Sequence, residues 1–200
     1  MASAPAPVVD VKIVPSGGPC SQPALTESIG LSLDATAITT LARIGGNGID
    51  QLFGSDGNDL LLFGAQSEGF AGGTGIDALS VTQADVRFVN FDQNTSGIET
   101  VDMRNGAANS VTLNAADVLD FGGTTGETVN GNTIDLVVRG DTGATADTLH
   151  LQQTGGVHFA LDTSGVALND PAFGGPGTLY NVFSNGTENV AVEDGVTVTV

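Results

Sequence analysis

Apolar residues recur every nine positions between residues 45 and 80. This apolar column consists of Leu52, Leu61, Phe70 and Leu79. Each of these residues stands in the middle of a triplet, and extended chain points the middle side chain of a triplet to one face and its neighbours to the other. The spacing therefore predicts four short strands, each of which buries one side chain.

Glycines and acidic residues fill the positions between these triplets in the same phase. The chain divides into units 45–53, 54–62, 63–71 and 72–80, and the first and fourth match G-G-x-G-x-D-x-U-x, where U is apolar. The second unit has serine at the second glycine, and the degenerate third unit still keeps the phase. The sixth position is acidic in every unit, as Asp50, Asp59, Glu68 and Asp77. A chance match would lose its phase in the degenerate member, so the four units form one repeat.

Each position of the repeat has a physical role. Glycines at positions one, two and four allow positive φ angles and tight turns whose carbonyl oxygens point inward. The acid at position six adds a carboxylate beside these carbonyls, and several hard oxygen ligands are what Ca²⁺ requires. Two nonapeptides would form one coil of a flattened parallel solenoid, with the apolar column inside and metal in the turns. The alternative is a glycine- and aspartate-rich loop cluster without metal, which gives no reason for a nine-residue phase.

The units resemble the nonapeptide repeats of RTX (repeats-in-toxin) proteins, which Gram-negative bacteria secrete. The resemblance implies an all-β fold, a short parallel β-roll (an RTX-type β-solenoid) that is continued and capped by further β-strands. It also implies that each ion lies between two turns one coil apart and takes carbonyls and carboxylates from both. The first implied site consists of Gly46, Gly48, Asp50, Phe63, Ala65 and Glu68. The second consists of Ser55, Gly57, Asp59, Gly72, Thr74 and Asp77. The second matches the family better, because both of its carboxylates are aspartates.

The chain divides into four regions around this repeat. Residues 1–23 contain most of the prolines and are expected to form an extended N-terminal arm. The apolar, threonine-rich residues 24–44 are expected to cap the first coil. Residues 45–89 are expected to form the calcium-binding roll, extended by one metal-free strand that keeps Phe88 in the apolar column. Residues 90–200 are a β-rich continuation that supplies the other cap, because a solenoid of two coils leaves exposed sheet edges.

Eight strands and one helix are expected in residues 90–200. The strands are Ile98–Met103, Val111–Leu113, Ile134–Val138, Thr148–Leu151, Val157–Leu161, Leu179–Phe183, Val190–Val192 and Val196–Val200. Asn-Gly or Asp-Gly pairs at 105–106, 185–186 and 194–195 predict hairpin-like turns. Asn114 is the expected N-cap of a short helix over 114–119. This region is similar to the segment that follows the nonapeptide blocks of large bacterial RTX surface adhesins.

The composition limits the partners. The formal net charge is −18, from 23 acidic and 5 basic residues. This charge excludes nucleic acid as a partner and disfavours anionic membrane surfaces. No apolar run approaches the roughly 20 residues of a membrane-spanning helix, so no membrane insertion is expected. Crowded acids repel one another, so a cation is expected in the folded form.

Other candidate chemistry has weaker patterns. His150 and His158 would need a third zinc ligand that the spacing does not offer. A Ser-His-Asp triad lacks a nucleophile elbow, and the acids are periodic rather than convergent, so an enzyme is not expected. Residues 140–143 with Asp147 form either a further calcium loop or a solvated turn. Cys20 is the only cysteine, so its thiol is buried, reactive or a link between two chains.

The expected protein is a secreted, calcium-dependent structural protein at the surface of a Gram-negative bacterium or outside it. Residues 1–19 lack the charged start and apolar core of a cleavable signal peptide, and the resemblance implies type I secretion. The expected partner is the chain itself, in a surface layer, filament or biofilm matrix, or a cell-surface component. Two alternatives stay open: an adhesin module that binds a carbohydrate or a protein, and the secretion and folding domain of an RTX enzyme.

Overall fold

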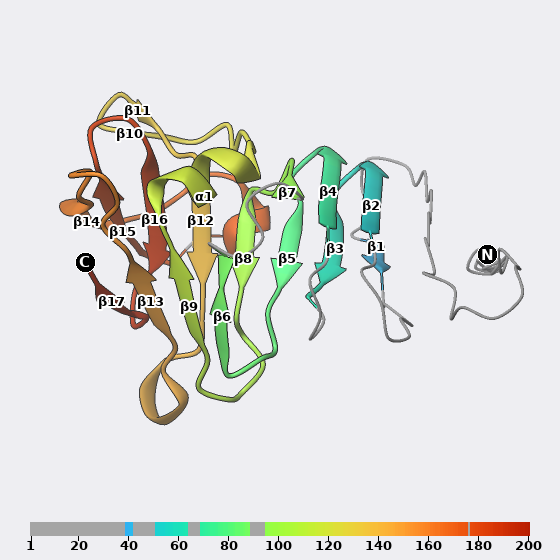
Figure 1. Cartoon of the computed structure of the whole chain (residues 1–200), viewed down its shortest axis with the longest axis horizontal. Coiled ribbons are helices and arrows are strands. Elements are labelled where there is room, and N and C mark those ends of the chain that lie inside the picture. The colour runs from blue at the N-terminus through green and yellow to red at the C-terminus, as the bar shows by residue number, and fades with distance from the viewer. Residues whose placement is uncertain (1–38, 42–50, 64–68, 89–94, 176) are drawn as a thin grey trace, which may run out of the picture.

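The structure, a computed structural model, describes residues 39–41, 51–63, 69–88, 95–175 and 177–200. Strands far outweigh helices in these residues, which confirms the all-β prediction. The strands form three larger sheets, named A, B and C, and one two-stranded hairpin. Figure 1 shows the strands side by side along the long axis of the molecule, from the N-terminal repeats to the C-terminal half.

Sheet A has eight strands in the order β1-β3-β5-β8-β12-β16-β15-β14. The first six are parallel to one another, whereas β15 and β14 are antiparallel to their neighbours. The strands of sheet A are β1 (Thr39–Leu41), β3 (Asp59–Leu62), β5 (Ala78–Ser80), β8 (Thr100–Asp102), β12 (Leu136–Arg139), β16 (Asn189–Glu193), β15 (Tyr180–Ser184) and β14 (Ala160–Val166). Neighbouring parallel strands cannot be joined by a hairpin, so the chain visits another sheet between them.

Sheets B and C are parallel throughout and supply these visits. Sheet B has the order β2-β4-β7 and accompanies the repeats, and sheet C has the order β17-β13-β9-β6 and accompanies the C-terminal half. The strands of sheet B are β2 (Gln51–Asp56), β4 (Gly69–Thr74) and β7 (Thr95–Ser96). The strands of sheet C are β6 (Asp85–Arg87), β9 (Ser110–Leu113), β13 (Thr148–Leu151) and β17 (Thr197–Thr199).

The pairing register follows the repeat. Leu61 of β3 pairs with Leu79 of β5, and Leu52 of β2 pairs with Phe70 of β4. Both pairs join residues two nonapeptides apart, and all four side chains are at most 3% exposed. The predicted apolar column is therefore the buried face of four strands. The next partner of Leu79 is Val101 of β8, which lies beyond the nine-residue phase.

A row of phenylalanines connects the repeats to the C-terminal half. The ring of Phe63 lies 5.7 Å from that of Phe70 and 5.6 Å from that of Phe88, and the Phe88 ring lies 5.2 Å from that of Phe121. Such pairs contribute about 0.5–1.5 kcal/mol beyond the area they bury. Phe63 stands where the other repeats have glycine, so the degenerate unit places an aromatic side chain in the core.

A second apolar cluster covers the outer face of sheet A in the C-terminal half. Val137 of β12 and Ala191 of β16 belong not to the main core but to a second buried cluster that includes Phe173 and Tyr180. Phe173 belongs to the short helix η3 (Pro171–Phe173), and the Tyr180 hydroxyl donates to its carbonyl oxygen. The chain thereby covers strands that would otherwise expose an apolar face.

The helix α1 (Ala115–Phe121) confirms the predicted helix and its cap. The Asn114 side chain accepts hydrogen bonds from the backbone N–H groups of Ala116 and Asp117, and the Asp117 carboxylate accepts the N–H of Asn114. This reciprocal capping stabilises a helix start by about 1 kcal/mol. Gly122 ends the helix in the left-handed region at φ 58°. A second single turn, η2 (Gly143–Thr145), follows β12.

Seven of the eight predicted C-terminal strands overlap observed strands closely, and the remaining one is displaced. The predicted strand at 157–161 begins instead at Ala160 and runs to Val166 as β14. Of the three predicted hairpin turns, only 185–186 joins antiparallel neighbours, β15 and β16. The pairs at 105–106 and 194–195 carry the chain from sheet A to sheet C, so the hairpin prediction was wrong there.

Two features differ from what the sequence predicted. Asn130 and Gly131 have φ angles of 53° and 86° and form the tight turn between β10 (Thr128–Val129) and β11 (Asn132–Thr133). This Asn-Gly pair was an available hairpin signal. The predicted metal-free strand near Phe88 exists as β6, but it opens sheet C rather than continuing sheet B. The N-terminal arm, 1–23, and most of the cap, 24–44, lie outside the described residues.

Candidate metal centre

The second implied site lies where two glycine-rich turns stack on each other. The Gly57 N–H donates to the Thr74 carbonyl oxygen at 2.8 Å. A Cβ atom on Gly54 would lie 2.3 Å from the Gly72 carbonyl oxygen, and one on Gly75 would lie 2.1 Å from the carbonyl oxygen of Gly57. Side chains cannot occupy such positions. The close approach of the two backbones therefore explains the glycines of the repeat.

Three acids form a buried column at the starts of neighbouring strands β3, β5 and β8. Asp59 is 2% exposed, Asp77 is fully buried and Glu99 is 3% exposed. The Asp59 N–H donates to Asp77 Oδ1 at 2.7 Å, and the Asp77 N–H donates to Glu99 Oε2 at 2.6 Å. The carboxylates of Asp77 and Glu99 thus each accept the backbone N–H of the preceding acid in the column.

Within the described residues, the two aspartates each keep one buried oxygen without a hydrogen-bond partner. These atoms are Oδ2 of Asp59 and Oδ2 of Asp77. They lie at equivalent places one coil apart, 2.6 Å and 2.5 Å from where Cβ atoms on Gly54 and Gly72 would be. Buried polar atoms almost always have partners, and an uncompensated buried charge costs several kcal/mol. The paired orphan oxygens therefore call for a positive group.

The electrostatics of the column agree with this requirement. Burial raises the pKa of Asp59. Burial, together with the nearby charges of Glu99 and Asp59, raises the pKa of Asp77 to about 7, although the hydrogen bond from the Asp59 backbone opposes the shift. Burial also raises the pKa of Glu99. Within the described residues no lysine or arginine pairs with any of the three acids.

The residues present fit Ca²⁺. Six to eight oxygen ligands suit this ion, and the implied site offers the carboxylates of Asp59 and Asp77 with main-chain carbonyls of the two stacked turns. The described residues contain no group of three or more His, Cys, Asp or Glu side chains arranged to hold a metal. An ion here would accordingly depend on carbonyl oxygens for most of its ligands, as the repeat pattern requires.

Only one residue of the first implied site lies within the described part of the chain. This residue is Phe63, whose carbonyl oxygen accepts a hydrogen bond from the side-chain amide of Gln83 at 2.9 Å. The other five residues of that site, Gly46, Gly48, Asp50, Ala65 and Glu68, lie outside the described residues. The prediction that these six residues hold an ion therefore stays a prediction.

Glu99 belongs to the acidic column but was not predicted from the sequence. Its Oε1 accepts the Thr124 N–H at 3.2 Å, so both of its oxygens have backbone partners. Residues 97–101 read Gly-Ile-Glu-Thr-Val and repeat the pattern Gly-Ile-Asp-Ala-Leu of residues 75–79. The signal was missed because the displacement between Asp77 and Glu99 is 22 residues, not 18. Glu99 closes the column on its C-terminal side.

The candidate loop at residues 140–147 is closed by its own backbone. Asp147 is fully buried, its Oδ1 accepts the Asn109 N–H at 2.7 Å, and its Oδ2 accepts the Asp141 N–H at 2.6 Å. The Oδ2 atom of Asp141 in turn accepts the N–H groups of Asn105 and Gly106. These carboxylates have N–H partners where the aspartates of the repeat have an orphan oxygen.

The comparisons with known proteins add no relative. No protein-family model matches the chain, and no curated protein or solved structure matches it. The resemblance to RTX proteins therefore rests on the repeat columns of the sequence alone and stays a prediction. None of the helices in the described residues has the length and apolar character that crossing a membrane requires.

Proposed function

We propose that this chain is a secreted structural protein in which Ca²⁺ completes a short parallel β-roll. The observation that carries the proposal is the pair of buried, unpartnered Oδ2 atoms on Asp59 and Asp77. In the proposal one ion lies between the two stacked turns and is held by both aspartates. The carbonyl oxygens of Ser55, Gly57, Gly72 and Thr74 complete its shell. The ion neutralises the buried carboxylates and links two neighbouring coils.

Calcium would then act as a folding ligand. An ion that binds only the folded form stabilises it by mass action, by about 2.7 kcal/mol at a free concentration one hundred times the dissociation constant. Without the ion the repeats contain buried acids and no compensating base. A chain exported unfolded by type I secretion would stay open where Ca²⁺ is scarce and would fold in calcium-rich surroundings outside a Gram-negative cell.

The C-terminal half would serve as the base on which the repeats fold. Two of its buried acids, Glu99 and Asp147, have backbone N–H partners for both oxygens. The row of phenylalanine rings from Phe63 to Phe121 continues the core into this half. It can therefore be stable without metal and cap one end of the roll.

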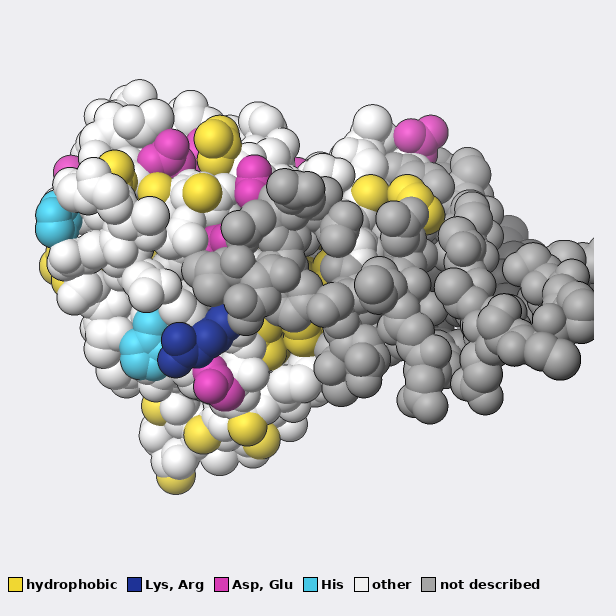
Figure 2. All heavy atoms as spheres, viewed as in Figure 1, with side chains coloured by type: hydrophobic (Ala, Val, Ile, Leu, Met, Phe, Trp, Pro, Cys, Tyr) yellow, Lys and Arg dark blue, Asp and Glu magenta, His cyan; other side chains and the backbone are white. Residues whose placement is uncertain are grey.

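Self-assembly into a surface layer, filament or biofilm matrix is part of the proposal. The edge strands of the sheets are where a second copy of the chain could pair. Edge strand β14 of sheet A has register shifts at Leu161–Thr163 and Thr163–Val166, and such irregularities hinder pairing with a further strand. Edge strand β17 of sheet C carries no such shift. On the face in Figure 2 apolar side chains are scattered among polar ones, so a strand edge suits self-association better than an apolar patch.

Sedimentation with and without Ca²⁺ tests self-assembly. The proposal expects larger species only with calcium. Replacing Val198 of β17, whose side chain is half-buried, with proline should remove them, because proline cannot donate to a neighbouring strand. A monodisperse monomer in both conditions would remove self-assembly and leave the folding role intact.

Calorimetric titration with Ca²⁺, followed by circular dichroism, tests the calcium role. The double variant Asp59→Asn, Asp77→Asn should lose calcium binding at this site and the calcium-dependent gain in stability, because amide oxygens carry no charge. In excess chelator the same variant should be at least as stable as the wild type, because it no longer buries two carboxylates. Asp85→Asn is the matched control, since Asp85 is exposed on β6 and lies outside the two stacked turns. Equal calcium stabilisation of all three proteins would contradict the proposal.

A further inference from the structure

The apolar core is open at the C-terminal end of the molecule. In one paired row of sheet A, Leu136 and Val190 are fully buried. The next residues of this row are Phe183, which is partly buried, and Leu161 of edge strand β14, which is 57% exposed. Directly paired residues lie on the same face of a sheet, so Leu161 is on the core side but uncovered. The apolar row therefore runs past the end of the core.

The facing sheet C loses its cover at the same end. Leu149 of β13 is fully buried, whereas its partner Val198 on edge strand β17 is partly buried, and Val200 is 57% exposed. The Thr197 N–H donates to the Asp147 carbonyl oxygen at 2.8 Å. Successive residues of a strand point their backbone groups to opposite sides, so the N–H and C=O of Val198 point to the open edge. Edge strand β17 thus offers backbone groups beside an uncovered apolar surface.

Sheet A is wider than sheet C at this end. Strands β5, β8, β12 and β16 are each followed along the chain by a strand of sheet C, whereas β15 and β14 have no counterpart there among the described residues. Figure 1 shows β14, β15 and β17 together at the end of the molecule that carries the C-terminus. Two strands at a spacing of ~4.8 Å make an overhang of about 10 Å. The overhang leaves room beside β17 for an added strand but obstructs the approach of a whole second sheet.

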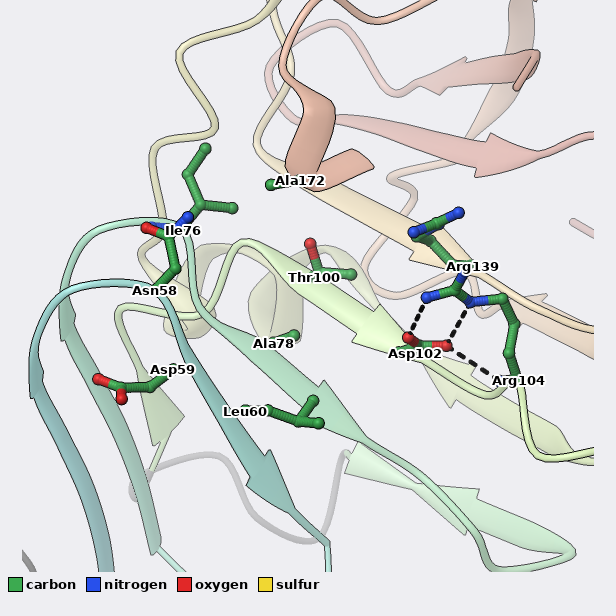
Figure 3. A pocket seen from close by; sticks show the side chains of 10 residues that line it. All are labelled: Asn58, Asp59, Leu60, Ile76, Ala78, Thr100, Asp102, Arg104, Arg139 and Ala172. Atoms are coloured by element: carbon green, nitrogen blue, oxygen red, sulfur yellow. Dashed lines mark hydrogen bonds and ion pairs between the residues drawn. The ribbon is translucent and has the colours of Figure 1, made fainter. Parts of the chain in front are cut away.

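The pocket of about 180 Å³ on the outer face of sheet A differs from this open end (Figure 3). Its two arginines already have partners. Arg104 pairs with Asp102 through Nε at 2.8 Å, and Arg139 pairs with Glu193 at 3.1 Å. The open end instead combines uncovered apolar side chains with a sheet edge that no described strand pairs with. This combination suits an extended strand with apolar side chains on one face.

We propose that residues 9–13 of a second copy add to β17 as a strand and cover the open end, an inference that rests on the self-assembly in the proposed function. Residues 9–13 read Val-Asp-Val-Lys-Ile, so apolar side chains recur at every second position. This is the pattern of a strand with one buried face. Its three apolar side chains would cover Leu161 and Val198, and Asp10 and Lys12 would face water.

The length of chain before β1 favours a neighbouring copy over the same copy. Residues 1–38 lie outside the described residues. Strands β1 and β14 are the two edges of sheet A, about 34 Å apart at ~4.8 Å per strand. If residues 24–44 cap the first coil, as the sequence predicts, residues 14–23 are the connection and span at most about 33 Å. This connection barely equals the sheet in length. A second copy stacked end to end brings its open end beside β1, and repetition of this contact produces a filament.

The first test adds a synthetic peptide of residues 7–15 to the full chain carrying Val11→Ser, whose own segment should not compete. In Ca²⁺ the peptide should bind saturably and move the amide NMR signals of Leu161, Phe183 and Val198. A peptide with Val11→Ser should bind at least tenfold more weakly, because position 11 lies on the apolar face. The control peptide with Lys12→Ser should bind about as well as the original.

Sedimentation of the full chain in Ca²⁺ is the second test. Leu161→Ser and Val11→Ser should each raise the protein concentration needed for larger species at least tenfold. Leu161 is 57% exposed, so its replacement should leave the fold intact, which circular dichroism checks. The matched controls are Leu119→Ser, whose side chain is 68% exposed on α1, and Lys12→Ser. Larger species that persist unchanged in Leu161→Ser would overturn the inference.

The outcomes separate this inference from the calcium proposal. No saturable peptide binding to the chain folded in Ca²⁺, or equal binding of the Val11→Ser peptide, overturns the inference and leaves the calcium role intact. Peptide binding by a chain that folds equally well in chelator supports the docking site and overturns the calcium role. A monomeric wild type whose Leu161 and Val198 signals move when Val11 is replaced places the segment in its own molecule and overturns docking between copies.

Discussion

The repeat block and the C-terminal half use buried acids at the same kind of place and complete them differently. In both regions a carboxylate at the start of a strand accepts the backbone N–H of the neighbouring coil, as Asp77 does for Asp59 and Asp147 does for Asn109. Asp147 has a second N–H partner in Asp141, whereas the second oxygen of Asp77 has no partner in the part of the chain that the structure describes. A buried aspartate therefore has hydrogen-bond partners for both oxygens in the C-terminal half and for only one oxygen in the repeats.

The length of the coils explains this difference. Asp147 receives its second hydrogen bond from Asp141, six residues away in the long connection after β12, and Glu99 receives one from Thr124 after α1. The repeats pair strands 18 residues apart, and no other donor among the described residues reaches the second oxygen of Asp59 or Asp77. Where the paired strands are close in sequence, one oxygen of each aspartate has no partner among the described residues, and where the connection is longer its own backbone supplies that partner.

The largest loss of stability should come from replacing a glycine of the repeat. A Cβ atom on Gly72 would lie 1.9 Å from the Gly97 carbonyl oxygen and 2.5 Å from Asp77 Oδ2. Gly72→Ala should therefore destabilise the folded protein by about 3 kcal/mol and weaken Ca²⁺ binding, because the stacked turns must separate. Chemical denaturation with and without Ca²⁺ measures both effects. The control Gly106→Ala has open space around its Cβ position and strains only its own φ of 81°. Comparable losses in the two variants would show that close stacking of the turns is unimportant.

A smaller, calcium-independent effect should follow from Asp147→Asn. The asparagine keeps one acceptor for Asn109 but turns an N–H group toward Asp141, which should cost about 2 kcal/mol. The loss should be equal in Ca²⁺ and in chelator, as measured by thermal or urea unfolding. Asp77→Asn should instead depend on the solution: it should lower the free energy of unfolding in Ca²⁺ and leave it unchanged in chelator. If Asp147→Asn lost its effect in chelator, the two regions would not differ as described.

The smallest expected effect is a pH dependence of the free energy of unfolding that arises from Asp77 in the repeats. The pKa of Asp77 is raised from 3.8 to about 7, so the folded, metal-free protein holds this proton more tightly than the unfolded chain. The free energy of unfolding in chelator should therefore be highest below about pH 4 and fall as the pH rises toward 7. Saturating Ca²⁺ should reverse this slope, because the ion requires the deprotonated carboxylate. Urea unfolding at several pH values checks both slopes, and Asp77→Asn should flatten them.

The repeat geometry could be predicted from the sequence, whereas the C-terminal half could be predicted only in part. The nine-residue phase predicted which residues are buried, from Leu52 to Leu79, and which turns need glycine. Asn114 predicted its helix because a cap is a local signal. Glu99 and the role of Asp147 were missed, because coil length changes after residue 80 and their partners lie 22 to 38 residues away. The nine-residue spacing predicts buried positions only as far as the repeats keep it.

Hydrogen exchange with and without Ca²⁺, measured residue by residue, tests the central claim most directly. With Ca²⁺, amides of β3 and β5, including those of Asp59 and Asp77, should be protected together with those of β12, β13 and β16. In chelator, protection should be lost in β3 and β5 and kept in the other three strands. Unchanged protection of Asp59 and Asp77 in chelator, or equal loss in both regions, would contradict a calcium-dependent repeat on a metal-independent base.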